Sequence, residues 1–379
     1  MSEPTLVELL ELGEEGLRPE LVGKLPPPWR MREQRGAGYD LDDPELVAAV
    51  KAALLLGQPL IVAGEPGVGK TSLADALAAR LGLFFHDPVQ VKSTTTGLDL
   101  FYGFDEVARF RDATRGRQVS AGGGVDAAPK GLRDYVRFSS LGRAVLWSAG
   151  PEARVALGSV PSHEILGFGG EVDTLTLGEL FPSEFDVTRI ESAGTAIRHQ
   201  VIGSQRSVVL LDELDKAPRD SPNDVLGELE TLSFRIAELD IQVRALPAAW
   251  PVVLITSNSE RSLPDAFLRR CVFHWIDFPG EERLEKIAAS RCAIAYGTKP
   301  EDALVKSAVK CFVDLRGEIE NKQPSTAEMI AFLAALLEFG FPRNQTLAPD
   351  DAMVRALFGT MVKTRIDRQT LGLTSQTER

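Results

Sequence analysis

One short stretch constrains the fold of this chain more than any other. Residues 64–71 read GEPGVGKT and match the pattern G-x-x-x-x-G-K-[ST] at every fixed position. The apolar run PLIVA precedes the stretch, and the helix-like segment SLADALAARLGL follows it. Glycines at these spacings let successive backbone N–H groups turn inward around phosphate oxygens, and the start of the helix adds its positive dipole end. The sequence therefore predicts a strand, a phosphate-binding loop and a helix, in that order.

The pattern also predicts which loop residues contact a nucleotide. Lys70 is expected to reach the β- and γ-phosphates, and Thr71 is expected to bind Mg²⁺, so ATP and Mg²⁺ are the expected ligands. A glycine-rich turn without a ligand is the alternative, but such a turn does not require a Lys-Thr pair after its last glycine. The residues expected to contact the nucleotide are Gly64, Glu65, Pro66, Gly67, Val68, Gly69, Lys70, Thr71 and Ser72.

A second apolar run, at 207–211, ends in two adjacent carboxylates within the sequence SVVLLDELDK. Ligands of an open parallel sheet sit at the carboxyl ends of its strands. Asp212 is therefore expected to hold Mg²⁺, and Glu213, which points to the other face, is expected to orient and deprotonate a water molecule. An acidic helix start after a core strand is the alternative interpretation.

A third apolar run, VVLITSN at 252–258, also ends in polar residues. The neutral amide of Asn258 can hydrogen-bond both a water molecule and the γ-phosphate, although a Ser-Asn pair after a strand is usually a turn. Strands that alternate with helices predict a parallel sheet covered by helices on both faces. From about Glu281 onward the pattern is helical only, which predicts a second, all-helical domain.

These patterns divide the chain into segments. The helix expected at Asp42–Leu56 has Asp42 or Asp43 as its N-cap. The irregular region at about 103–206 is expected to be a set of insertions, partly helical around Leu132–Leu146 and partly flexible. The expected segments are an N-terminal helix and Pro-rich linker at 1–38, an α/β nucleotide-binding domain at 39–279, a helical lid domain at 280–365 and a tail at 366–379.

Composition excludes several classes of protein. With 44% hydrophobic and 25% charged residues the chain is typical of a folded globular protein, and its formal net charge of −12 disfavours binding to nucleic acid. No apolar run approaches the length of a membrane span, and the acidic N-terminus is unlike a signal peptide, so a cytoplasmic location is expected. Cys271, Cys292 and Cys311 are expected to be reduced, mostly buried thiols, and His86, His163, His199 and His274 to be structural.

The order of these motifs resembles that of AAA+ ATPases, and three segments resemble the MoxR-like branch. These are VKSTTTGLDLFYGFD at 91–105, DELDKAPRDSPNDVLGELE at 212–230 and LPDAFLRRCVFHWIDFP at 263–279, within a resemblance that spans roughly 40–340. The resemblance implies a ring, usually a hexamer, with nucleotide bound at the subunit interfaces. It also implies that Arg270, or otherwise Arg269, contacts the γ-phosphate in a neighbouring subunit. If the family resemblance is set aside, the ordinary role of an arginine at a helix C-terminus is to complement the helix dipole.

The chain departs from this family at the start of a lid helix. The family carries a sensor arginine there, but residues 323–328 read QPSTAE, with Ala327 at the expected position and Lys322 as a speculative substitute. Ser325 and Glu328 have the spacing of a helix capping box. This departure predicts slow or partner-dependent hydrolysis.

The resemblance also bears on the irregular region. The family's hairpin-like insertion is expected at Phe104–Arg117, where Arg109 and Arg111 belong either to a client contact or to a basic helix face. The 150–206 segment is expected to be a solvated loop with one small helix rather than a partner-docking element.

The leading functional hypothesis is a MgATP-hydrolysing motor that remodels or activates protein clients, with a von Willebrand factor A-type partner implied by the resemblance. One alternative is a nucleic-acid motor that uses GTP, because residues 257–270 also resemble restriction-associated GTPases. Another is a nucleotide-gated interaction protein with little turnover. The missing sensor arginine favours this last alternative, while Asp212, Glu213 and Asn258 disfavour it.

Overall fold

The computed structural model describes residues 39, 43–119, 130–190, 196–218, 221–258, 263–319, 321–348 and 350–373. The expected N-terminal helix and Pro-rich linker lie outside these residues. The chain forms two compact units. The α/β unit comprises Leu41–Gly64 and Leu73–Ile276, and the helical unit comprises Asp277–Arg379 together with Glu65–Ser72 and the segment that contains Tyr39.

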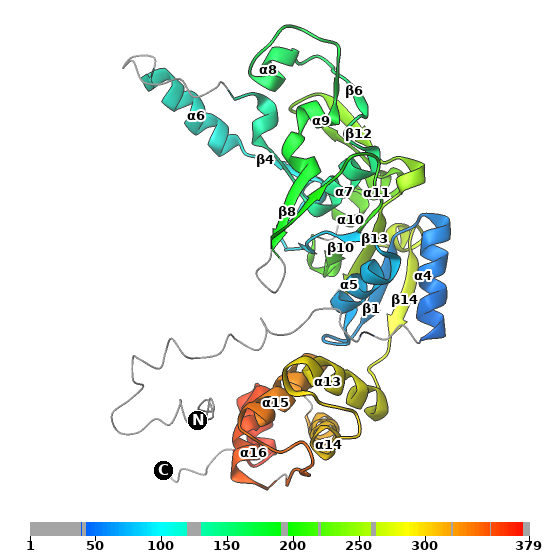
Figure 1. Ribbon diagram of the computed structural model, residues 1–379, viewed down its shortest axis with the longest axis vertical. Coiled ribbons are helices and arrows are strands. Elements are labelled where there is room, and N and C mark those ends of the chain that lie inside the picture. Colours follow the sequence, from blue (N-terminus) through cyan, green and yellow to red (C-terminus); the bar gives the residue numbers. More distant parts are fainter. Residues whose placement is uncertain are drawn as a thin grey trace. The chain divides into compact units, whose positions relative to one another are not determined.

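The α/β unit is built on one parallel sheet, shown in Figure 1. Its strands lie in the order β14 (Val272–Ile276), β1 (Leu60–Gly64), β13 (Val252–Ser257), β10 (Ser207–Asp212) and β2 (Phe84–Phe85), and β3 (Val89–Gln90) also pairs with β10. Every pair in this sheet is parallel. The predicted parallel α/β fold is confirmed.

Burial explains why the three predicted strands are continuous apolar runs. Every residue of β1, β10 and β13 is buried, as expected for strands enclosed on both faces. Helix α4 (Pro44–Leu56) packs against β14 and β1, and α7 (Ser140–Ala149) packs against β10. Asp43 is the N-cap of α4 and accepts the Glu45 N–H at 2.9 Å, which confirms one of the two expected caps.

The chain between β3 and β10 is more regular than expected. Helix α6 (Glu106–Val119) occupies most of Phe104–Arg117, so the expectation of a hairpin-like insertion there is wrong. The alternative of a helix face that carries Arg109 and Arg111 agrees with the structure, in which both residues are exposed on α6. The Asp105 carboxylate accepts the Ala108 N–H at 2.8 Å and caps the first turn of this helix. Of the three antiparallel strand pairs in the described part of this region, the last, β8 (Asp186–Ile190) with β9 (Ala196–Gln200), directly precedes β10.

The expectation of a solvated loop at 150–206 is also wrong. Apolar residues interleaved among its acidic ones, such as Leu177, Leu180 and Phe185, are buried in the core of the unit. Between β3 and β8 the chain forms, in order, η1 (Leu98–Leu100), β4 (Tyr102–Phe104), α6, η2 (Leu132–Tyr135), β5 (Val136–Phe138), α7, β6 (Arg154–Ala156), α8 (Ser162–Leu166), β7 (Thr174–Thr176), α9 (Leu177–Leu180) and η3 (Pro182–Phe185).

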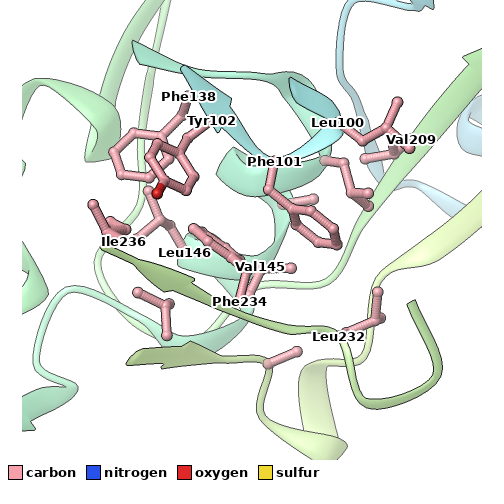
Figure 2. Close-up of a cluster of buried hydrophobic side chains, with 14 of the residues drawn as sticks. Leu100, Phe101, Tyr102, Phe138, Val145, Leu146, Val209, Leu232, Phe234 and Ile236 are labelled. Carbon is pink, nitrogen blue, oxygen red and sulfur yellow. The ribbon is translucent and has the colours of Figure 1, made fainter. Parts of the chain in front are cut away.

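A buried aromatic cluster anchors this region to the strand that carries the carboxylates. Figure 2 shows Phe101 beside Phe234, whose rings stack with centroids 5.0 Å apart, together with Val145 of α7 and Val209 of β10. Phe234 lies on β11 (Ser233–Ile236), which pairs with β12 (Ile241–Arg244). The remaining elements between β10 and β14 are η4 (Leu214–Lys216), α10 (Ser221–Asp224), α11 (Leu226–Thr231), η5 (Pro247–Ala249), β13 and α12 (Asp265–Leu268).

The helical unit has its own core. It contains α13 (Glu281–Tyr296), α14 (Ala303–Glu318), α15 (Thr326–Glu338), α16 (Ala352–Leu357), η6 (Phe358–Thr360) and α17 (Arg365–Thr370). Ser325 and Glu328 form the expected capping box at the start of α15. Cys292 and Cys311 are buried, Cys271 is partly buried, and all three are free thiols, as expected. None of the helices in the described ranges is long and apolar enough to cross a membrane.

Candidate nucleotide-binding and catalytic site

The predicted phosphate loop lies between β1, which ends at Gly64, and α5 (Lys70–Leu81). Gly67 and Gly69 have φ angles of +83° and +95°. L-residues with side chains rarely adopt this conformation, so the backbone path of the loop requires glycine at both positions. A loop curled in this way, followed by a helix N-terminus, is the arrangement expected of an anion-binding loop.

The loop also packs closely within the helical unit. A Cβ atom added to Gly67 would lie 2.4 Å from the Cβ atom of Ser325, and one added to Gly69 would lie 3.0 Å from the Tyr39 ring. The two glycines are therefore fixed by close contact as well as by backbone conformation. Ser72, the last residue of the expected contact set, accepts a hydrogen bond from Nη2 of Arg291 at 2.8 Å.

Lys70 is the buried cation of the loop. Its side chain is 6% exposed, and its ammonium group donates to the Glu65 carbonyl oxygen at 2.9 Å. A buried ammonium that bonds to a loop carbonyl can exchange that acceptor for a phosphate oxygen, which carries more negative charge. The loop residues thus fit a polyphosphate. Thr71, the expected Mg²⁺ ligand, follows Lys70 in the first turn of α5 and is exposed.

The carboxylate of Asp212 is held by residues from two neighbouring strands. Its Oδ1 accepts the Thr256 hydroxyl of β13 at 2.6 Å, and its Oδ2 accepts the Gln90 amide of β3 at 2.8 Å. Asp212 is only 9% exposed, so these bonds orient a carboxylate that burial would otherwise destabilise. This position at the end of β10 is suited to a metal ligand.

Glu213 follows directly and has an unusual backbone conformation. Its φ of +59° lies in the left-handed region, and its N–H donates to the Thr256 hydroxyl oxygen at 2.8 Å. One buried hydroxyl therefore joins the backbone of Glu213 to the side chain of Asp212. A non-glycine residue with positive φ is uncommon and often marks a functional position.

The side chain of Glu213 contacts a residue that we expected and one that we did not. Its Oε1 accepts the Asn258 amide at 2.8 Å, so the structure brings these two candidate catalytic residues together. Its Oε2 forms an ion pair with Lys216, which sequence reasoning did not single out. The three-residue spacing within DELDK was the available signal for this pair.

The candidate arginine finger lies on the surface of the α/β unit. Arg270 is 44% exposed, and its Nε donates to the Glu230 carboxylate at 3.1 Å. Its Nη1 also donates to the Ala266 carbonyl oxygen at 2.9 Å, within the turn that ends α12. Its proposed contact with a neighbouring subunit stays a prediction, as does the same role for Arg269.

An unexpected arginine of the helical unit contacts the loop. Arg316, in the last turn of α14, forms an ion pair with Glu65, although the two residues are 251 positions apart in sequence. The two positions considered from sequence, Ala327 and Lys322, are exposed. No local pattern indicates Arg316, because only the folded helical unit brings its guanidinium to the loop.

The described residues contain no group of three or more His, Cys, Asp or Glu side chains that could hold a metal ion by themselves. A Mg²⁺ ion held by Asp212 would therefore need oxygen ligands from outside this group of side chains, such as those of a nucleotide. Two of the histidines expected to be structural contact other side chains: His86 lies 2.9 Å from the Ser207 hydroxyl, and His274 lies 3.5 Å from the Asp43 carboxylate.

Comparisons with known proteins give limited information. No protein-family model and no curated protein matches the chain. A solved structure of NtrX from Brucella abortus in complex with ADP is similar over 89% of this chain and 58% of that chain, with 13% identity and a TM-score of 0.39. This chain therefore spans less than two thirds of NtrX, and the likeness is too weak to assign fold or function. The fold class rests instead on the strand order and the glycine-rich loop described above.

Proposed function

We propose that this chain is a Mg²⁺-dependent ATPase of the AAA+ type, of the MoxR-like branch. The observation that carries the proposal is the bonded group at the ends of two neighbouring parallel strands. Asp212 ends β10 and Glu213 follows it; Thr256 of β13 bonds to Asp212, and Asn258, just after β13, bonds to Glu213. Strand β13 also pairs with β1, the strand that leads into the phosphate loop. Carboxylates at this edge of a sheet suit metal-assisted phosphoryl transfer.

In the proposed reaction the chain binds ATP through the loop N–H groups and Lys70. Thr71 and Asp212 would hold Mg²⁺, which neutralises charge on the phosphates. Glu213 accepts a proton from water as the water oxygen bonds to the γ-phosphorus. The bond between this phosphorus and the β,γ-bridging oxygen breaks, and ADP and phosphate leave. Asn258 orients the carboxylate of Glu213 through the hydrogen bond described above.

The assembly and the partners rest on the family resemblance. We propose a cytoplasmic ring, usually a hexamer, in which Arg270 reaches the nucleotide of a neighbouring subunit. The clients are protein substrates that the ring remodels or activates, together with a von Willebrand factor A-domain protein. The exposure of Arg270 supports this assignment, because a finger for a second subunit must lie at the surface.

Phosphate release from MgATP tests the enzymatic part of the proposal. Removing a general base typically costs about 10²–10⁴-fold in rate, so Glu213→Gln is expected to bind ATP while losing nearly all turnover. Glu301→Gln, which changes an exposed carboxylate, is the matched control and should retain turnover. Full turnover in Glu213→Gln would remove this residue from the mechanism.

The same assay at increasing protein concentration tests the ring. If subunits share active sites, activity per subunit rises with concentration and Arg270→Ala abolishes it. Activity that is independent of concentration and survives in Arg270→Ala would contradict the ring but not the ATPase. A preference for GTP and salt-sensitive binding of labelled DNA would instead favour a nucleic-acid motor.

A second candidate is a nucleotide-gated interaction protein with little turnover. The ion pair between Lys216 and Glu213 favours it, because an ammonium on the proposed base opposes proton uptake from water. Binding of ATP without turnover in the wild-type chain, and turnover that appears in Lys216→Ala, would support this candidate. Lack of turnover in both proteins would leave Glu213 without a catalytic role.

A further inference from the structure

Two residues of the helical unit outside the phosphate loop hold the guanidinium group of Arg316. Its central carbon lies 3.8 Å from the centroid of the Phe278 ring, in a cation–π contact. Its Nη1 donates to the Pro324 carbonyl oxygen at 2.6 Å. The side chain is 13% exposed. Arg316 is therefore oriented in advance, with its Nη2 directed at the phosphate loop.

The partner of Nη2 is held less firmly. Glu65 belongs to the loop, and its side chain is 50% exposed. An ion pair with one partner half exposed contributes little stability, on the order of 0–1 kcal/mol. Glu65 is thus the exchangeable member of the pair, whereas Phe278 and Pro324 would keep Arg316 in place after its removal.

Two cations converge on this single loop residue. Lys70, the expected phosphate ligand, donates to the carbonyl oxygen of Glu65, and Arg316 binds its carboxylate. Both cations therefore rest on acceptors that the loop itself supplies. A nucleotide polyphosphate offers more negative charge than one carboxylate, and its oxygens match the fork of a guanidinium.

We propose that Arg316 is a nucleotide-binding residue that exchanges the Glu65 carboxylate for a phosphate when nucleotide enters the loop. This inference rests on the proposed nucleotide-binding function and adds a ligand from the helical unit. It assigns Glu65 an opposing role, because the carboxylate competes with the phosphates for the same guanidinium. Arg316 supplies a positive charge that the sequence 323–328 lacks.

The exchange also links nucleotide to the start of α15. The Pro324 carbonyl that binds Arg316 immediately precedes Ser325, which caps α15 and packs against Gly67 of the loop. Arg316 thus contacts both the loop and the residue before the cap of a lid helix. Replacement of the Glu65 carboxylate by a phosphate at Nη2 would therefore occur beside both.

A double-mutant cycle on the full-length chain tests this inference through binding alone. The equilibrium dissociation constant for ATPγS with Mg²⁺ is measured by calorimetry for wild type, Arg316→Gln, Glu65→Gln and the double variant. Arg355→Gln removes a charge from the helical unit at a site where the guanidinium bonds to the Gly372 carbonyl, and it is the matched control. Circular dichroism and melting temperature show whether each variant folds. If Arg316→Gln does not fold, Arg316→Lys, which keeps the charge, takes its place.

The two explanations of the ion pair differ in one comparison. If Arg316 binds phosphate, Arg316→Gln weakens ATPγS binding about tenfold or more, also in the Glu65→Gln background, since a charge-assisted bond is lost. Glu65→Gln alone tightens binding. If Arg316 only neutralises Glu65, Arg316→Gln has no effect once Glu65 is glutamine, and this result overturns the inference. Lys70→Ala separates the failure of this inference from the failure of the proposed function. If Lys70→Ala loses ATPγS binding while Arg316→Gln and the double variant bind as tightly as their parent proteins, only the role of Arg316 is refuted. If the wild-type chain does not bind ATPγS, the proposed function is refuted.

Discussion

Replacing Thr256 by valine tests the hydrogen bonds that hold Asp212, the last residue of β10, and Glu213, which follows it. Thr256 is 1% exposed, and its hydroxyl donates to Asp212 and accepts the N–H of Glu213. Valine keeps the shape of the side chain and removes only these bonds. In this variant the buried N–H of Glu213 and the buried carboxylate of Asp212 each lose a hydrogen-bond partner.

The expected cost follows from those two groups. A buried backbone donor without a partner costs about 1–3 kcal/mol, and a lost bond to a charged acceptor costs about 1.5–3 kcal/mol. Asp212 keeps the bond from Gln90, so the second value should be near its lower end. We expect Thr256→Val to lower the free energy of unfolding by roughly 2–4 kcal/mol. This is a large part of the stability of a typical domain, which is about 5–15 kcal/mol.

Urea unfolding followed by tryptophan fluorescence is the appropriate assay. Trp147, Trp250 and Trp275 belong to the α/β unit, and residues 277–379 contain no tryptophan. The fourth tryptophan, Trp29, lies outside the described residues, so the assay uses Trp29→Phe as its background. With a slope of about 2–3 kcal/mol per molar urea, the midpoint should fall by about 1 M.

Two further variants serve as controls. Thr256→Ser keeps the hydroxyl and should lose about 1 kcal/mol for its missing methyl group. Thr231→Val removes an exposed hydroxyl and should change little. Equal stability and equal ATP turnover in Thr256→Val and Thr256→Ser would refute the bridging role of the hydroxyl.

Three other predictions address the loop, the acid range and the thiols. Gly67→Ala should abolish ATP binding in a calorimetric titration, since the φ of +83° and the 2.4 Å approach to the Cβ atom of Ser325 both exclude a methyl group. Wild-type affinity in this variant would contradict the prediction. The Ser159 N–H and Arg235 hold the pKa of Asp240 below its usual 3.8, so its contribution to stability is complete above that pH and declines as the pH falls below it. The melting-temperature difference between wild type and Asp240→Asn should therefore be constant from pH 7 to 5 and shrink below pH 4, and a constant difference down to pH 2 would refute the assignment. Burial raises the pKa of Cys271 to about 12 and that of Cys311 to about 11, so the native chain should resist Ellman's reagent at pH 8 and react after denaturation; rapid reaction of the native chain would show that these thiols are accessible.

The sequence was sufficient to predict those parts of the candidate site that depend on local pattern. The positive φ angles at Gly67 and Gly69 follow from the loop motif, and the parallel pairing of β10 with β13 explains why Glu213 and Asn258 meet. Buried parallel strands appear as apolar runs in the sequence, so the residue at which each strand ends can be located from the local sequence alone.

The rest depends on contacts that no local pattern encodes. The pairing of Arg316 with Glu65 requires the folded helical unit, and the bridge through Thr256 requires the register of β13 against β10. Short elements between 103 and 206 escaped prediction because strands of three residues show no measurable period. The hairpin-like insertion expected at Phe104–Arg117 came from family resemblance alone, and the segment forms a capped helix instead.

The left-handed backbone of Glu213 places function and stability in opposition at one residue. A side chain in this conformation costs roughly 1 kcal/mol or more relative to glycine, which adopts it freely. Glycine at position 213 would relieve the strain but remove the carboxylate, so a stabilising substitution at this position would inactivate the proposed enzyme. Retention of glutamate at this position therefore requires selection on the carboxylate itself, and sequences of related chains should show glycine here only where turnover has been abandoned.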